Sequence, residues 1–290
     1  AHTQFYTLSR HAALPICLRR APFDGSGVLE FSGLTTVSNG TQAASVSLGA
    51  LTVRNTGTWL QAAGSSGGSS ISRNFASGPG VFENLGEFEQ TTARPLIVQV
   101  PIRNGGRMAF AGTTVTFDGT ESLGRFGKYL PQPGGELALN NTTLDHKSAG
   151  TLDLAAGLLR GTGAIWTTGI NGGKVINRAR LQVGNPTGVL QLNTETGFEQ
   201  TATGELIVTL ANTGSSQLNL RGRAAVLGGA LKVELAEGFT PVLGQTFDVL
   251  IDISGRTGEF DQVSLPDLGS GLRLVVSYSA TKVTLTVEAA

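Results

Sequence analysis

A seven-residue pattern recurs along this chain and constrains its fold more than any other feature. Each copy reads apolar, any residue, Asn, any residue, Gly or Ala, any residue, apolar. The four copies span residues 53–59, 82–88, 102–108 and 175–181. Asn and Gly tolerate the left-handed backbone that a tight corner needs, and an Asn side chain bonds nearby backbone groups. The pattern therefore predicts the end of one strand, a corner built on Asn and Gly, and the start of the next strand.

A longer repeated sequence indicates that such units stack. The sequence FEQT, followed by LIV, occurs at residues 88–91 and 96–98 and again, 110 residues later, at 198–201 and 206–208. We interpret the two copies as equivalent coils of one repetitive scaffold. The first three motif asparagines lie 29 and 20 residues apart, which falls within the repeat range of stacked architectures.

The remaining sequence favours strands over helices. Apolar and polar residues alternate at 190–192, 231–235 and 283–287, and 41 of the 290 residues are Gly. No stretch shows the apolar stripe of an amphipathic helix. We therefore predict an all-β chain that forms a parallel β-helix, or β-solenoid. A large β-sandwich, or several small ones, is the alternative.

The C-terminal half carries motifs of a known family. The sequences are GLLRGTGAI at 157–165, NGG at 171–173, GVLQL at 188–192, FEQ at 198–200, LGGALKV at 227–233, GQTFDVL at 244–250 and GEF at 258–260. This succession resembles the passenger repeats of autotransporter-type surface proteins, well over residues 150–288 and loosely over 25–149. One departure is VGNP at 183–186, where the family often has Pro-Gly.

The resemblance implies a right-handed parallel β-helix that is exported from a Gram-negative-like cell. The expected function is a structural or adhesive passenger segment of a bacterial surface or secreted protein, located at the cell surface or outside the cell in association with the outer membrane. A membrane barrel, if the full gene encodes one, is expected to be missing from this fragment.

The start of the chain is expected to lie outside the fold. Residues 7–16 read TLSRHAALPI, which resembles a translated sequencing adapter, TLSLHDALPI, at eight of ten positions. We predict that residues 1–20 are an artefactual or disordered tail, with a genuine N-terminal tail as the alternative. The β-solenoid is predicted over 21–237, and a looser C-terminal β cap over 238–290.

Two excursions from the coil are predicted, at 62–80 and 119–135. The first is rich in Gly and Ser, as flexible loops are. The second contains a candidate ligand loop. Its residues are Arg125, Phe126, Lys128 and Tyr129, which are predicted to contact a host or environmental glycan or protein surface, because loops on rigid scaffolds often carry binding. The alternative is an ordinary insertion whose aromatic residues pack back on the coil.

The residues offer little for catalysis, metals or cofactors. The segment GSSGG at 64–68 matches a serine-hydrolase motif but lacks the helix that should follow it. His146 is expected at the surface, where Asp145 points to the opposite face of the strand. Zinc needs several His or Cys ligands, and the calcium-binding nonapeptide and the P-loop are missing. We therefore predict no catalytic, cofactor or metal residues, and no enzyme.

Charge and hydropathy exclude other classes. The formal net charge is zero, and no basic face points to nucleic acid. No apolar run is long enough for a transmembrane helix. The single cysteine, Cys17, excludes an internal disulfide framework.

The alternative function is a carbohydrate-active β-helix enzyme, either a polysaccharide lyase or a glycoside hydrolase. Both classes gather carboxylates on one face. Acidic residues such as Asp118, Glu136, Asp145 and Asp153 follow no regular spacing. The test is whether three carboxylates lie within reach of one another on one face.

Overall fold

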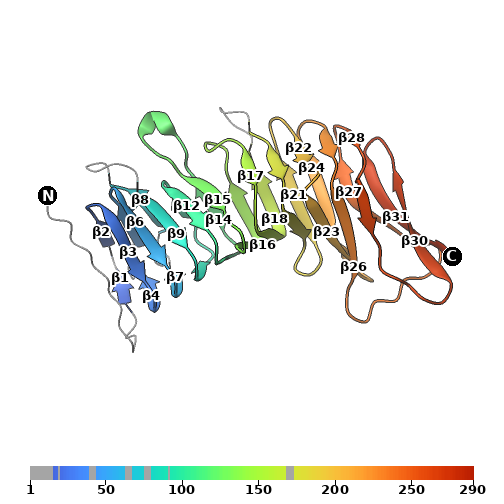
Figure 1. Cartoon of the computed structure of the whole chain (residues 1–290), viewed down its shortest axis with the longest axis horizontal. Coiled ribbons are helices and arrows are strands. Elements are labelled where there is room, and N and C mark those ends of the chain that lie inside the picture. Colours follow the sequence, from blue (N-terminus) through green and yellow to red (C-terminus); the bar gives the residue numbers. More distant parts are fainter. Residues whose placement is uncertain are drawn as a thin grey trace.

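The chain folds as a β-solenoid, a stack of short parallel strands (Figure 1). The computed structural model describes residues 16–18, 20–38, 44–62, 67–74, 80–90, 92–167 and 173–290. Within these residues the only helix is a short 3-10 turn, η1 (Glu121–Leu123). The predicted all-β parallel β-helix is therefore confirmed, and a β-sandwich is excluded.

Each coil contributes one strand to each of three faces. The first face consists of two successive five-stranded sheets. The first sheet contains β3 (Gly27–Phe31), β6 (Leu51–Asn55), β9 (Val81–Asn84), β12 (Pro101–Asn104) and β15 (Lys128–Pro131), and the second contains β17 (Leu152–Leu154), β19 (Val175–Asn177), β22 (Phe198–Gln200), β25 (Ala225–Leu227) and β28 (Arg256–Gly258). The second face consists of β1 (Ile16–Leu18), β4 (Leu34–Val37), β7 (Thr58–Gln61), β10 (Glu87–Gln90), β13 (Arg107–Ala111), β20 (Arg180–Val183), β23 (Glu205–Leu210), β26 (Ala230–Leu235) and β29 (Gln262–Ser264). The third face consists of β2 (Arg20–Phe23), β5 (Ala44–Leu48), β8 (Ser69–Arg73), β11 (Leu96–Val98), β14 (Thr114–Phe117), β21 (Val189–Asn193), β24 (Gln217–Arg221) and β27 (Thr246–Asp252). The long strands β16 (Glu136–Asp145) and β18 (Leu158–Trp166) run through the corner between the second and third faces.

The interior is apolar because alternate residues of each strand point inward. An aromatic stack fills the early coils. Ring centroids lie 5.5 Å apart for Phe31 and Trp59, 5.0 Å for Trp59 and Phe82, and 5.8 Å for Phe82 and Phe88. Buried aliphatic side chains continue this single core through the later coils. Each coil therefore buries its apolar residues only against its neighbours, as expected for a solenoid.

A ladder of buried amides runs along one corner of the coil. Asn55 Nδ2 donates to Asn84 Oδ1 at 2.8 Å, and Asn84 Nδ2 donates to Asn104 Oδ1 at 2.8 Å. Asn104 Nδ2 ends the ladder by donating to Tyr129 Oη at 3.1 Å. Each amide also bonds a backbone carbonyl of the following strand, such as Asn55 Nδ2 to the carbonyl of Glu87 at 2.9 Å. The motif asparagines thus fasten each corner to the next coil.

A shorter ladder follows in the later coils. Asn177 Nδ2 donates to Gln200 Oε1 at 3.1 Å. Both ladders begin with an oxygen that has no donor, since Asn55 Oδ1 and Asn177 Oδ1 are buried without a partner. The residues before them in register are Phe31 and Leu154, whose apolar side chains donate no hydrogen bond. The amides therefore all point the same way along the axis, and the first carbonyl of each ladder stays unsatisfied.

The motif glycines are needed for a reason other than the predicted one. The corners are confirmed, but Gly57, Gly86 and Gly106 do not adopt left-handed backbone. Instead they stack: a Cβ at Gly86 would lie 2.1 Å from the carbonyl oxygen of Gly57, and a Cβ at Gly106 would lie 2.1 Å from that of Gly86. The predicted left-handed corner is therefore wrong. Close approach between successive coils selects glycine here.

The two FEQ segments are not equivalent positions of the coil. Residues 88–90 belong to β10 on the second face, whereas residues 198–200 form β22 on the first face. Their local roles do agree, because Gln90 and Gln200 are both buried and both donate to backbone carbonyls. The prediction of equivalent coils is wrong. The repeated feature is a strand that ends in a buried Gln at a corner, and the two copies lie on neighbouring faces of the coil.

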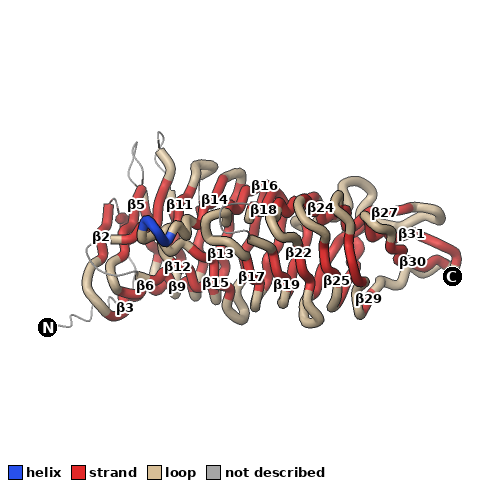
Figure 2. The backbone as a smooth tube through the Cα atoms, turned by 90° about the horizontal axis from the view of Figure 1, so that it is seen from above, coloured by secondary structure: helices blue, strands red, loops and turns tan. Residues whose placement is uncertain are grey.

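Three predicted boundaries differ from the structure. Residues 16–18 of the predicted tail form β1, which pairs with β4, while residues 1–15 and 19 lie outside the described residues. The predicted loop 62–80 contains β8, whose Ile71 is fully buried, so that loop prediction is wrong for residues 69–73. The second predicted loop, 119–135, contains β15. Its projecting part is confined to the segment around η1, which rises from the rod in Figure 1 and is the blue segment seen from above in Figure 2.

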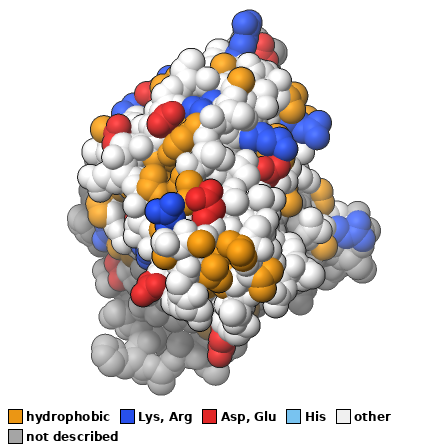
Figure 3. Space-filling model, turned by 90° about the vertical axis from the view of Figure 1, so that its right-hand side faces the viewer, with side chains coloured by type: hydrophobic (Ala, Val, Ile, Leu, Met, Phe, Trp, Pro, Cys, Tyr) orange, Lys and Arg blue, Asp and Glu red, His pale blue; other side chains and the backbone are white. Residues whose placement is uncertain are grey.

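The C-terminal cap begins later than predicted. The strands β28 and β29 still pair in parallel with β25 and β26, so coils continue to Ser264 rather than ending at residue 237. Beyond them, β31 (Lys282–Ala289) pairs antiparallel with both β27 and β30 (Leu272–Tyr278). Figure 3 looks onto this end, where hydrophobic side chains gather among polar atoms. The antiparallel hairpin of β30 and β31 lies beyond the last parallel coil.

Candidate functional site

A trough of about 250 Å³ lies on the second face. Glu89, Ala109, Ala138 and Arg160 occupy one outward register row across four successive strands. The two alanines form a low floor between two long charged side chains. Since parallel strands lie about 4.8 Å apart, Glu89 and Arg160 are separated by about 14 Å along the axis.

One wall of the trough is a cluster of ion pairs around Arg107. Its guanidinium lies 3.2 Å from Glu87, 3.6 Å from Glu89 and 3.4 Å from Glu136. The hydrogen bond with Glu87 raises the pKa of Arg107 above its ordinary value. These partly exposed pairs add little stability individually. They fix the position of three carboxylates on one face.

The far end of the trough is formed by Arg160. Its Nε donates to Glu136 at 2.8 Å, and its Nη1 donates to Asn185 Oδ1 at 2.6 Å. Among the described residues, Nη2 of Arg160 has no hydrogen-bond partner in the protein. A planar guanidinium held on two sides presents its remaining N–H groups in a fixed direction. The trough thus offers donors at one end and carboxylate acceptors at the other.

A β-bulge shapes the edge of the trough. The pairing of β16 with β18 shifts register between Leu139 and Thr142. Asn141 adopts a left-handed backbone with φ 47°, and its N–H donates to Thr162 Oγ1 at 2.9 Å. The neighbouring Asn140 lines the trough. Bulges are frequent at places where a sheet re-aims side chains for function.

The carboxylates named from the sequence do not converge. Glu136 lies in the Arg107 cluster, but Asp118 pairs with Arg125 at 2.8 Å, and Asp153 pairs with Arg178 at 3.1 Å. Three carboxylates of the second face do gather: Glu87, Glu89 and Glu136 surround Arg107. Within the described residues, no group of three or more His, Cys, Asp and Glu side chains is arranged to hold a metal ion.

The predicted ligand loop is only partly a surface feature. Arg125 is tied to Asp118, and Phe126 lies 5.5 Å from the guanidinium of Arg73. Tyr129 belongs to β15 and is 4% exposed, because its ring points into the core and its hydroxyl ends the first amide ladder. Burial raises the pKa of its phenol. The predicted surface role of Tyr129 is therefore wrong. Of the four predicted ligand-loop residues, Tyr129 alone packs fully into the coil, which is what the alternative prediction describes.

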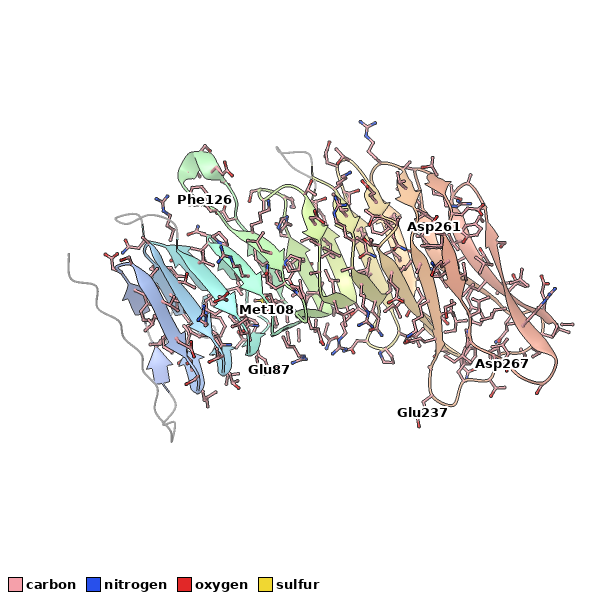
Figure 4. The ribbon with its side chains drawn as sticks, viewed as in Figure 1. Glu87, Met108, Phe126, Glu237, Asp261 and Asp267 are labelled. Atoms are coloured by element: carbon pink, nitrogen blue, oxygen red, sulfur yellow. The ribbon has the colours of Figure 1, made fainter. Side chains whose placement is uncertain are left out.

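Phe126 and Lys128 do share a second groove of about 210 Å³. Glu121 of η1 and Pro101 also line it. Phe126 and Glu87, labelled in Figure 4, lie at opposite edges of the rod. The two grooves are therefore separate, and Arg125 lines neither of them.

The prediction of a surface His146 is wrong. Its side chain is 0% exposed, its Nδ1 lies 3.1 Å from the carbonyl oxygen of Gly150, and its ring packs 5.7 Å from that of Phe117. Burial lowers the pKa of His146 to about 4. The physical reason is alternation: Leu144 and His146 face inward, so Asp145 faces outward. The GSSGG segment lies mostly outside the described residues.

Sequence reasoning missed the residues that build the trough. The signal was present for two of them, because Glu87 and Arg107 each follow a motif asparagine by three residues. Stacked corners place that position in one column, which the register of Glu87 with Arg107 shows. Arg160 and Asn185 follow no copy of the motif, so their place depends on loop lengths that only the fold reveals.

Comparison with known proteins identifies no relative. No family model matches the chain, and no curated protein matches it either. Among the described residues, no helix has the length and apolar character needed to cross a membrane. The site must therefore be interpreted from its own geometry.

Proposed function

We propose that this chain is a structural and adhesive segment of a bacterial surface or secreted protein, of the autotransporter passenger type. The observation that carries the proposal is the single continuous core, fastened from coil to coil by buried amides. Such a stack is stiff along its axis, because strands of the second and third faces pair from coil to coil through the middle of the rod, where β16 and β18 join them. A stiff rod holds its outward side chains at fixed spacing and suits a stalk that presents a binding surface.

The trough supports the adhesive part of the proposal. Its floor of Ala109 and Ala138 leaves room for a ligand, while Glu89 and Arg160 supply acceptors and donors at its ends. Hydroxyl-rich glycans and polar peptide segments both bind through such groups. The ion-paired carboxylates lie outside the core, so a ligand engages them without disturbing the stack.

Surface binding of the labelled full chain tests this function. The chain is applied to arrays of glycans and matrix proteins and to cell surfaces. Ala138→Trp fills the trough and should weaken retention at least about tenfold, whereas Thr257→Trp, on the first face, should leave it unchanged. Retention on none of these surfaces would refute the adhesive role.

A second candidate function is a carbohydrate-active enzyme, favoured by the gathering of Glu87, Glu89 and Glu136 beside two arginines. A glycosidase needs two carboxylates on opposite sides of the scissile bond. Here all three instead share Arg107, which favours binding over hydrolysis. Incubation with polysaccharides, followed by assays for new reducing ends and unsaturated products, tests the enzyme. Turnover that disappears in Glu136→Gln would establish it over the adhesive segment.

A further inference from the structure

One tryptophan is exposed on the third face. The chain has two tryptophans. Trp59 is 0% exposed in the core, whereas Trp166 is 36% exposed at the end of β18, on the third face. Tryptophan is enriched at binding surfaces, because its ring packs against apolar groups while its polar end stays hydrated. Trp166 contributes nothing to the aromatic stack of the interior.

Hydrogen-bonding side chains surround Trp166. Asp145 and Asn193 are its register neighbours on the strands before and after. Lys147 Nζ lies 4.7 Å from the ring centroid. Gln191 Nε2 donates to Asn193 Oδ1 at 2.9 Å, which orients the two amides beside the ring. The arrangement combines an apolar ring with donors and acceptors on both sides.

The strip next to this row is low and polar. Thr143, Ala164 and Gln191 are register neighbours on the same face. The small side chain of Ala164 precedes Trp166 by two residues, so the surface beside the ring is open. A flat ligand that follows the axis meets polar groups on successive strands about 4.8 Å apart.

The charges around the ring are balanced. Lys147 Nζ lies 3.7 Å from Asp145 Oδ2, so the two charges next to Trp166 cancel. Such a surface does not select a strongly charged ligand. It matches a pyranose ring, which has apolar C–H faces for an aromatic side chain and hydroxyl groups around its rim for amides and carboxylates.

We propose that the third face around Trp166 binds an uncharged polysaccharide chain, with Trp166 stacked on a sugar ring and with Asp145 and Gln191 bonded to its hydroxyl groups. This inference rests on the proposed adhesive function, because it names one class of ligand for the rod. It adds a binding surface distinct from the trough, which lies on the second face.

Acrylamide quenching of tryptophan fluorescence tests the inference in the full chain, because Trp59 is buried and Trp166 is accessible. Soluble hydroxyethylcellulose, xylan and dextran are the probes, and polygalacturonate is the anionic comparison. At least one neutral polysaccharide should protect Trp166 from acrylamide, also at high salt. Trp166→Ala lacks this reporter, so its binding is measured by affinity electrophoresis in gels that contain the same polysaccharide. It should bind about 30-fold more weakly than the unaltered chain, the loss expected when an aromatic hot-spot residue is truncated.

The control is Val226→Ala, which truncates an exposed side chain on the first face and should bind as the unaltered chain does. Trp59 emission that stays blue-shifted in Trp166→Ala shows that the core is intact. The inference is overturned if no neutral polysaccharide protects Trp166, if polygalacturonate alone does, or if Trp166→Ala binds equally well. Adhesion that persists unchanged in Trp166→Ala overturns only this inference, whereas a chain that adheres to no surface overturns the proposed function.

Discussion

Removing one rung of the first amide ladder should destabilise the chain more than any exposed asparagine does. Asn84 is 0% exposed and sits in the middle of that ladder. It accepts from Asn55 Nδ2 and donates to Asn104 Oδ1, each at 2.8 Å. It also donates to the carbonyl oxygens of Gly86 at 3.2 Å and Arg107 at 3.1 Å. Asn84→Ala removes all of these bonds.

The magnitude follows from what is left unpaired. Asn104 Oδ1 loses its donor inside the core, which costs about 1–3 kcal/mol. An amide nitrogen has two hydrogens, and one bonds Asn104, so the bonds to the two backbone carbonyls share the other and together contribute about 1 kcal/mol. Asn55 is affected least, because its Nδ2 keeps the carbonyl of Glu87. We therefore expect Asn84→Ala to lower the free energy of unfolding by about 3 kcal/mol.

Urea unfolding followed by circular dichroism measures this loss, and hydrogen exchange of β9 and β12 localises it. The matched control is Asn212→Ala, which truncates an exposed asparagine outside the strands. It should cost less than about 0.5 kcal/mol. Equal losses in the two variants would refute the idea that the ladder holds the coils together.

Three further predictions concern the interior. Gly106→Ala places a Cβ 2.1 Å from a backbone oxygen and should lower the free energy of thermal unfolding by about 3 kcal/mol or more. In the control, Gly105→Ala, the new Cβ lies 3.1 Å from a leucine Cδ2, and the loss should be less than half as large. Equal melting temperatures in the two variants would contradict the close stacking of the glycines. Because burial lowers the pKa of His146 to about 4, the unfolded chain binds the proton more readily than the folded chain. The free energy of unfolding should therefore fall by about 3 kcal/mol as the pH drops from 6.5 to 4, and it should not change above pH 6.5. His146→Leu should lack this slope, and an identical slope in both proteins would count against the buried imidazole. Leu154→Ala should lower the free energy of unfolding by about 2–5 kcal/mol. Leu154→Asn supplies a donor to the unpaired Asn177 Oδ1, so its loss in urea titrations should be smaller. A larger loss for Leu154→Asn would rule out the proposed ladder direction.

The corners of the coil could be predicted from the sequence because their signal is local. Asn55, Asn84 and Asn104 mark true strand ends, and alternation identifies the inward residues. The reason for the glycines could not be predicted in the same way. A residue such as Gly106 is selected by the distance to the preceding coil, which no single corner contains.

Positions that depend on register were harder to predict. His146 was placed at the surface because its type is usually polar, yet alternation after Leu144 directs it inward. The sequence predicts a loop at Tyr129, which lies beside Pro131 and Pro133, but its strand pairs with β12. The trough requires Glu89, Ala109, Ala138 and Arg160 in one row. The intervening coils have unequal lengths, so no constant spacing in the sequence identifies that row.

The central claim is that the first face is one regular stack, and distances between spin labels test it most directly. Single cysteines are introduced in a Cys17→Ser background at Arg54 and, in turn, at Asp153, Glu199 and Thr257. These outward positions lie four, six and eight strands beyond β6 in the order of the first face. The stack predicts backbone separations of about 19, 29 and 38 Å, from about 4.8 Å per strand. Distances that fail to increase in this order would contradict the solenoid.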